Sequence, residues 1–292
     1  MQHLRDQRVI NQPFCNLKGV SFQYLQPNSQ RLQPAQGQAA VIGRDGKAQL
    51  LIDRSKPVIG MFVTMEVQDV PAIVQAAHAC GVAVALDNTY AAGVMFDAFA
   101  HGVDVSMQAL TKYVGGHSDL LLGSVSARDK DAFERLGPIY QQLGLAVSPD
   151  DCSLALRGLQ TLAVRLEVLE RNTLEIANWL ADHPFVAQVL HPALPSCPGH
   201  DVWTRDFSGS TSVFSFIFTD AISADQVVNF INQLKIFKIG MSWGGINSLA
   251  LVYPDLQRPA QDFGGRIVRL NIGLEKVEDL TDDLVQAMAQ LS

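Results

Sequence analysis

Lys112 is the residue whose surroundings most clearly suggest chemistry. Lysine is scarce in this part of the chain, and Lys112 has apolar residues nearby and the pair Gly115-Gly116 behind it. A lysine buried among apolar groups loses the solvation of its charge, so its pKa falls and its amine becomes available as a nucleophile. The alternative is a lysine whose stem packs on the core while its ammonium group reaches water.

An acidic residue follows a short apolar run. Asp87 comes directly after Val82–Leu86, which has the composition of a strand covered on both faces. Because ligands bind at the carboxyl ends of the strands in open parallel sheets, Asp87 is a candidate ligand-binding carboxylate. The alternative is an aspartate that forms a turn or caps a helix.

Arg269 is the lone charge in the strand-like run 267–272. An arginine there is either an edge-strand residue or a planar fork that pairs with a carboxylate. Ser242 and Trp243 lie ahead of it in the chain, followed by two glycines that allow close backbone approach.

These three candidates match the requirements of one cofactor. Pyridoxal phosphate (PLP) is held by a lysine Schiff base and needs an acid beside its pyridine nitrogen. Its amino-acid substrate needs a cation for the α-carboxylate. Lys112, Asp87 and Arg269 therefore predict a PLP site that takes an amino acid.

The elements that must position these residues alternate between strand and helix after residue 57. Val58–Val63 and Val82–Leu86 are predicted strands. Between them, Asp69 caps a helix, Pro71 lies in its first turn and Gly81 ends it. Strand, helix and strand form a βαβ unit, which predicts a parallel sheet.

The remaining pattern continues this alternation. Further helices are expected at Ala92–Ala100, Lys130–Gln142, Leu154–Ala181, Ala224–Leu234 and Lys276–Leu291. Further strands are expected at Asp104–Met107, Leu120–Ala127, Val186–Leu190, Thr211–Phe218, Phe237–Met241 and Arg266–Ile272.

Seven segments of the chain carry a family resemblance. They are VTMEVQDVPAIV (63–74), LDNTYAAGV (86–94), GVDVSMQALTKYVGGHSD (102–119), LRGLQTLAVRLE (156–167), HPALP (191–195), SWGG (242–245) and IVRLNIGLE (267–275). This set resembles the Cys/Met-metabolism family of PLP-dependent enzymes, and within it the bacterial cystathionine β-lyases. Such an ordered set is far more specific than any lone motif.

The resemblance implies an α/β fold of the PLP-dependent transferase type, as in aspartate aminotransferase. It implies a large domain with a mostly parallel sheet and a smaller C-terminal α/β domain. We therefore expect the remainder of an N-terminally incomplete large domain over 58–158 and the small domain over 159–292. Residues 1–57 are expected to be an atypical, poorly ordered segment.

The resemblance also assigns roles on the cofactor side. Lys112 would hold PLP and later remove the substrate Cα proton. Asp87 would keep the pyridine nitrogen protonated, and Thr111 would contact the phosphate.

On the substrate side, the resemblance implies that Arg269 pairs with the carboxylate while Ser242 and Trp243 line the same part of the pocket. Trp243 and Ala109 favour the β-lyase branch, because the γ-lyases and γ-synthases usually carry Leu and Ser there. The implied reaction is β-elimination of cystathionine to homocysteine, pyruvate and ammonia, a step of methionine biosynthesis. The implied assembly is a homo-oligomer, either a dimer or a tetramer.

Residues 1–57 do not match the part of the family that precedes Val58. That part supplies a phosphate loop, an aromatic ring that stacks on PLP, and a Tyr/Arg pair that reaches the neighbouring subunit, whereas Tyr24 is the only tyrosine here. Leu110 and Met241 also differ from the residues that the family usually carries at these positions, but these differences are smaller. We therefore expect weak PLP binding and little or no cystathionine cleavage. Three alternatives stay open: a working β-lyase, a truncated and catalytically silent homologue, and a cysteine desulfhydrase or γ-lyase.

Composition bears on the remaining classes of function. A net charge of −7 disfavours nucleic-acid binding. No apolar run approaches the roughly 20 residues that span a bilayer, and the first residues lack the apolar centre of a signal peptide. The four cysteines are too scattered for a disulfide framework or a zinc site, so we expect no metal and a cytoplasmic protein.

Overall fold

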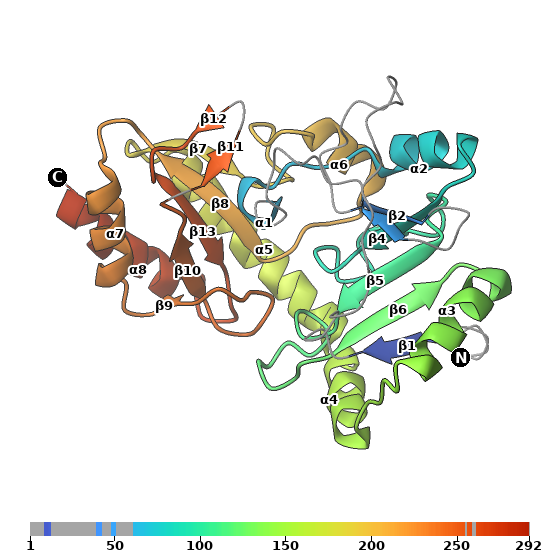
Figure 1. Cartoon of the computed structure of the whole chain (residues 1–292). Helices are drawn as coiled ribbons and strands as arrows, with labels where there is room; N and C mark the ends of the chain where they lie inside the picture. The colour runs from blue at the N-terminus through green and yellow to red at the C-terminus, as the bar shows by residue number, and fades with distance from the viewer. Residues whose placement is uncertain are drawn as a thin grey trace. The chain divides into compact units, whose positions relative to one another are not determined.

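The computed structural model describes residues 9–12, 39–42, 48–50, 61–254, 256–258 and 261–291. They form two compact units (Figure 1). Unit 1 holds the described strands before residue 54, Gln68–Gly115 and Asp119–Gln160. Unit 2 holds the described residues from 61 to 67, Gly116–Ser118, and the chain from Thr161 onward. Apart from three short strands, the segment 1–57 that we expect to be poorly ordered lies outside the described residues.

Unit 1 is an α/β unit, as predicted. Its described elements are β1 (Val9–Gln12), β2 (Ala39–Ile42), β3 (Ala48–Leu50), α2 (Val70–Ala79), β4 (Ala83–Asp87), β5 (Val105–Ala109), β6 (Gly123–Ala127), α3 (Lys130–Gln142) and α4 (Pro149–Leu159). The start of α2 confirms the predicted cap, because the Asp69 carboxylate accepts a bond from the Ala72 N–H at 3.1 Å. Gly81 follows the helix with φ 71°, a conformation that glycine adopts without strain.

The sheet of unit 1 has the order β1-β6-β5-β4-β2-β3. β4 and β5 pair in parallel, with Asp87 opposite Met107, whereas the other described pairs are antiparallel. The sheet is therefore mixed rather than mostly parallel. One reason is the connection from β5 to β6, which contains no crossover helix and returns the chain in the opposite direction. The strands β1, β2 and β3 add the other antiparallel pairs. Because β4 and β5 run side by side in the same direction (Figure 1), their last residues, Asp87 and Ala109, lie at the same edge of the sheet.

The predicted helix at Ala92–Ala100 is wrong, because this segment is a series of turns. Ala92 and Gly93 both have positive φ, at 53° and 70°. A Cβ on Gly93 would lie 2.1 Å from Gln108 Nε2, so the backbone approaches that side chain closely. The Asn88 side chain also donates to the Phe96 carbonyl at 3.0 Å and closes a turn that a helix would not allow.

Unit 2 is a second α/β unit. Its described elements are α1 (Met61–Thr64), α5 (Leu162–Ala181), β7 (Val186–Leu190), α6 (His200–Asp206), β8 (Val213–Phe218), α7 (Ala224–Gln233), β9 (Lys238–Ile239), β10 (Leu249–Val252), β11 (Gln257–Arg258), β12 (Gln261–Asp262), β13 (Ile267–Asn271), α8 (Val277–Met288) and η2 (Ala289–Leu291). The prediction of a strand over Val58–Val63 is wrong, because α1 occupies its described part. The sequence patterns also missed α6, β10, β11 and β12.

The predicted helix Leu154–Ala181 is two helices, α4 and α5. The backbone leaves the helical conformation at Thr161, where φ is −111° and ψ is 3°. The apolar pattern continues across this point because both helices bury one face, so periodicity alone does not mark the break. No helix in the described ranges is long and apolar enough to cross a membrane.

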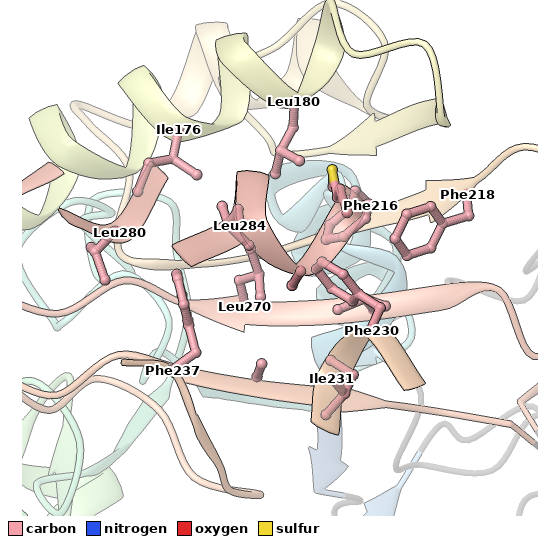
Figure 2. Close-up of a cluster of buried hydrophobic side chains, with 14 of the residues drawn as sticks. Ile176, Leu180, Phe216, Phe218, Phe230, Ile231, Phe237, Leu270, Leu280 and Leu284 are labelled. Atoms are coloured by element: carbon pink, nitrogen blue, oxygen red, sulfur yellow. The ribbon is translucent and has the colours of Figure 1, made fainter. Parts of the chain in front are cut away.

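The main core of unit 2 lies between its sheet and three helices (Figure 2). Ile176 and Leu180 of α5 and Leu284 of α8 point toward Leu270 of β13 (Figure 2). The sheet has the order β7-β8-β13-β10-β9. Side chains alternate between the two faces of a strand, so the burial of Val268 and Leu270 in this core places Arg269 and Asn271 on the other face.

Candidate functional site

Asp87 lies partly buried at the carboxyl end of β4. The backbone N–H of Thr89 donates to its Oδ1 at 3.0 Å, and the Thr89 hydroxyl donates to the same oxygen. Burial raises the pKa of this carboxyl above 3.8, whereas the two bonds from Thr89 and the positive charge of Lys112 lower it. The electrostatic effect of Lys112 shows that these two predicted site residues lie near each other in unit 1.

Thr89 is a site residue that the sequence reasoning missed. Its hydroxyl accepts a bond from the Ala109 N–H at 2.8 Å while it donates to Asp87, so it ties the end of β4 to the end of β5. Its backbone bond to Asp87 forms an Asx-turn, in which an aspartate accepts from the N–H two residues later. The Asp-x-Thr spacing is the signal that could have found it.

Lys112 lies in the turn that follows β5. Its N–H donates to the Ala109 carbonyl at 3.0 Å, and the Gly115 N–H donates to the Leu110 carbonyl at 2.7 Å. Lys112 is partly buried, and Tyr113 and Val114 beside it are buried. The turn therefore holds the lysine against an apolar part of unit 1.

Thr111 lies next to Lys112, but its hydroxyl already has partners within the chain. It donates to the Leu122 carbonyl at 3.2 Å and accepts from the Leu122 N–H at 3.0 Å. The backbone N–H of Thr111 also donates to the Leu122 carbonyl at 3.1 Å. A phosphate contact from this hydroxyl would require it to change partners.

Arg269 is buried in the middle of β13 in unit 2. Its Nη2 donates to the carbonyls of Gly240, Met241 and Ser242, at 3.3, 2.8 and 3.2 Å. Its guanidinium carbon lies 5.6 Å from the centre of the Tyr253 ring. The sequence patterns did not point to Tyr253. Three carbonyls and an aromatic face thus hold the guanidinium in one orientation.

Ser242 and Trp243 follow one another in the loop 240–248. Ser242 is exposed and Trp243 is buried. The contact of the Ser242 carbonyl with Nη2 brings this loop to Arg269. The predicted residues thus form two groups, with Asp87, Thr111 and Lys112 in unit 1 and Ser242, Trp243 and Arg269 in unit 2.

Comparison with known proteins identifies the family. Residues 62–289 match the model of the Cys/Met metabolism PLP-dependent enzyme family. The chain is 42% identical over 237 residues to the cystathionine beta-lyase MetC of Escherichia coli strain K12, and 45% identical over 234 residues to a putative cystathionine beta-lyase of Rhizobium johnstonii. It is also similar to the crystal structure of cystathionine gamma synthase from Xanthomonas oryzae pv. oryzae, with a TM-score of 0.73 and 32% sequence identity.

These matches cover most of this chain and a smaller share of each relative. They span 78% of this chain in all three cases, but 60%, 59% and 61% of the E. coli, R. johnstonii and X. oryzae proteins. The matched range contains Asp87, Thr111, Lys112, Ser242, Trp243 and Arg269. The chain belongs to the Cys/Met metabolism family of PLP-dependent enzymes.

Proposed function

We propose that this chain is a PLP-dependent carbon–sulfur lyase that cleaves cystathionine to homocysteine, pyruvate and ammonia. The observation that carries the proposal is a partly buried carboxyl, Asp87, at the end of β4, with the charge of Lys112 near it from the turn after β5. Similarity to the cystathionine beta-lyases supports the substrate.

Asp87 fits the pyridine nitrogen of PLP. Both bonds that the described residues give to its carboxyl end on Oδ1, so Oδ2 can accept a bond from a protonated ring nitrogen. Burial makes the carboxylate costly without a cation, and a protonated ring supplies one. When bound, PLP supplies an electron sink for the electron pair left at Cα.

The residues of unit 1 move and hold protons in this proposal. The Nζ of Lys112 takes the Cα proton of the substrate, and the Oδ2 of Asp87 would accept a hydrogen bond from the protonated ring nitrogen. Thr89 keeps the Asp87 carboxyl in place through its two bonds. The Cβ–S bond then breaks, and the proton that Lys112 took from Cα goes to the sulfur, which leaves as the thiol of homocysteine. Water converts the three-carbon remainder to pyruvate and ammonia.

The residues of unit 2 bind the substrate in this proposal. Arg269 pairs with the α-carboxylate, and its contacts with the loop 240–248 set the plane of its guanidinium. In the same proposal, Ser242 and Trp243 line the site where the α-carboxylate binds. We further propose a homo-oligomer in the cytoplasm, by similarity to the family and from the scattered cysteines.

The test is the substitution Lys112→Ala in the purified chain supplied with PLP. Wild type should carry PLP on the peptide that contains Lys112 after borohydride reduction, as seen by mass spectrometry, and should release pyruvate from L-cystathionine. Lys112→Ala should lose the label and at least about 100-fold of the pyruvate release, because the variant lacks the proton-accepting amine.

Lys130→Ala is the matched control. The Lys130 side chain is 83% exposed and pairs with Glu134 on α3, so its loss should change neither readout. A label on another lysine, or full pyruvate release by Lys112→Ala, would contradict the proposal. Release of 2-oxobutyrate from cystathionine would instead favour the γ-lyase, and pyruvate from cysteine alone would favour the desulfhydrase.

A further inference from the structure

We infer that Asn271 is a positioning residue for the carboxylate site, and that it acts through the loop 240–248. The inference rests on the proposed function, because it concerns how Arg269 is presented to a substrate carboxylate. Asn271 is the last residue of β13, two residues after Arg269, and therefore on the same face of the strand. It is 1% exposed, so its amide group is buried.

The amide of Asn271 binds the loop at two places. The Gly244 N–H donates to its Oδ1 at 2.8 Å, and its Nδ2 donates to the Asn247 carbonyl at 2.9 Å. One donor and one acceptor on the same side chain thus join both ends of the turn 244–247. A neutral amide can do this, whereas an aliphatic side chain can make neither bond.

The other part of the loop is bound to Arg269. The carbonyls of Gly240, Met241 and Ser242 accept from Nη2, so the loop is attached to β13 at Arg269 and again at Asn271. If the turn 244–247 moved, the preceding carbonyls would move with it. Because those carbonyls orient the guanidinium, Asn271 controls the orientation in which Arg269 meets a carboxylate.

A third attachment keeps the effect of Asn271 local. Glu275 accepts from the Ser248 N–H at 2.9 Å and from the Ser248 hydroxyl at 2.8 Å. These bonds hold the end of the loop without Asn271. Ile246 is also held without Asn271, because its N–H donates to the Gly116 carbonyl at 3.0 Å and its carbonyl accepts from the Leu274 N–H at 2.9 Å. Loss of the Asn271 amide should therefore loosen residues 240–245 and leave the rest of unit 2 in place.

The first measurement is hydrogen–deuterium exchange of the purified chain. Asn271→Asp keeps the shape and the acceptor but replaces the donor to Asn247 with an oxygen, and Asn271→Ala removes both bonds without adding charge. Both variants should raise exchange in peptides covering 240–248 at least about tenfold, with no change in peptides of β8. Ser212→Ala is the control: it removes the hydroxyl that donates to the same Oδ1 at 2.8 Å and leaves both bonds between Asn271 and the loop, so exchange in 240–248 should stay close to wild type.

The second measurement is steady-state kinetics with PLP and L-cystathionine. Both Asn271 variants should raise KM about tenfold while kcat stays within about threefold, because carboxylate binding is weakened and proton transfer at Lys112 is not. Unchanged exchange in 240–248, an equal rise across β8, or a loss of kcat with unchanged KM would overturn the inference. A wild-type chain that cleaves no cystathionine would contradict the proposed function, whereas the exchange data would still decide whether Asn271 positions the loop.

Discussion

Asp87 carries a carboxyl group in surroundings that disfavour its charge. Burial outweighs the bonds from Thr89 and the charge of Lys112, so the pKa of Asp87 lies above 3.8 in the folded chain. A raised carboxyl pKa means that ionisation costs more in the folded than in the unfolded state. The free energy of unfolding therefore falls as the pH rises from the pKa of the unfolded chain through the higher pKa of the folded chain. A cation that pairs with the carboxylate would reverse this loss.

We predict that Asp87→Asn is more stable than wild type at pH 7 when no PLP is present. The asparagine keeps an acceptor for Thr89 and has no charge to bury, so the melting temperature should rise by about 2 °C. The difference should vanish near pH 3, where the wild-type carboxyl is mostly protonated in both states. Thermal unfolding of both chains from about pH 3 to about pH 7.5 measures this.

Asp97→Asn is the control for this substitution. Asp97 is exposed and accepts a bond from the Ala100 N–H at 3.0 Å, so it has a similar local contact without the burial. Its melting temperature at pH 7 should stay within about 1 °C of wild type. If Asp87→Asn melted below wild type at every pH, the carboxylate would be stabilising and the argument would be wrong.

At the scale of elements, a buried histidine lies just after β7. His191 directly follows β7, and its Nδ1 accepts from the Ala193 N–H at 3.1 Å. Its Nε2 has no hydrogen-bond partner in the part of the chain that the structure describes. Burial lowers the pKa of His191 to about 4, so the ring is neutral at pH 7.

We predict that His191 makes unit 2 sensitive to mild acid. The unfolded chain binds a proton at this ring near pH 6.5 and the folded chain does so only near pH 4, so stability is lost as the pH falls between these values. His191→Asn keeps an acceptor for Ala193 and cannot titrate. Between pH 7 and pH 5, urea unfolding of wild type should lose about 2 kcal/mol more than that of the variant. An equal loss in both chains would show that other groups cause the acid sensitivity.

At the scale of the whole molecule, the number of hydrogen-bond donors for the phosphate determines how strongly the chain binds PLP. The phosphate of PLP carries about two negative charges and needs several N–H or O–H donors. In the described part of unit 1, the Thr111 hydroxyl is paired with Leu122, and Ala109 has no hydroxyl. Each missing charge-assisted bond weakens binding by about 1.5–3 kcal/mol, or roughly 10- to 150-fold.

We therefore predict that the Kd of the 292-residue chain for PLP lies above ~1 μM. A Kd of ~1 μM corresponds to a binding free energy of about −8 kcal/mol. Cystathionine cleavage should be low at stoichiometric PLP and should rise with added PLP. Absorbance titration with PLP, together with pyruvate release at each concentration, measures both quantities. Micromolar or tighter binding with ordinary turnover would contradict this prediction.

Local sequence patterns predicted much of the fold because the interactions behind them are local. The Asp69 cap of α2 and the strand Val186–Leu190 form as predicted, since capping and alternation depend on neighbours along the chain. The position of Asp87 after an apolar run was enough to place it at the end of β4. The family motifs predicted the roles of the remaining candidate residues, which spacing alone left open.

Contacts between residues far apart in the chain were decided only by the tertiary structure. The turns at 92–100 depend on the packing of Gly93 against Gln108, and a local apolar pattern contains no trace of that contact. Asn271 reaches Gly244 across 27 positions, and Thr89 reaches Ala109 across 20. A hydrogen bond needs its two atoms within about 3.5 Å and aligned, which only the packed sheet and its loops bring about. The sequence by itself thus determined which residues could do the chemistry, and the tertiary structure decided which other residues hold them in position.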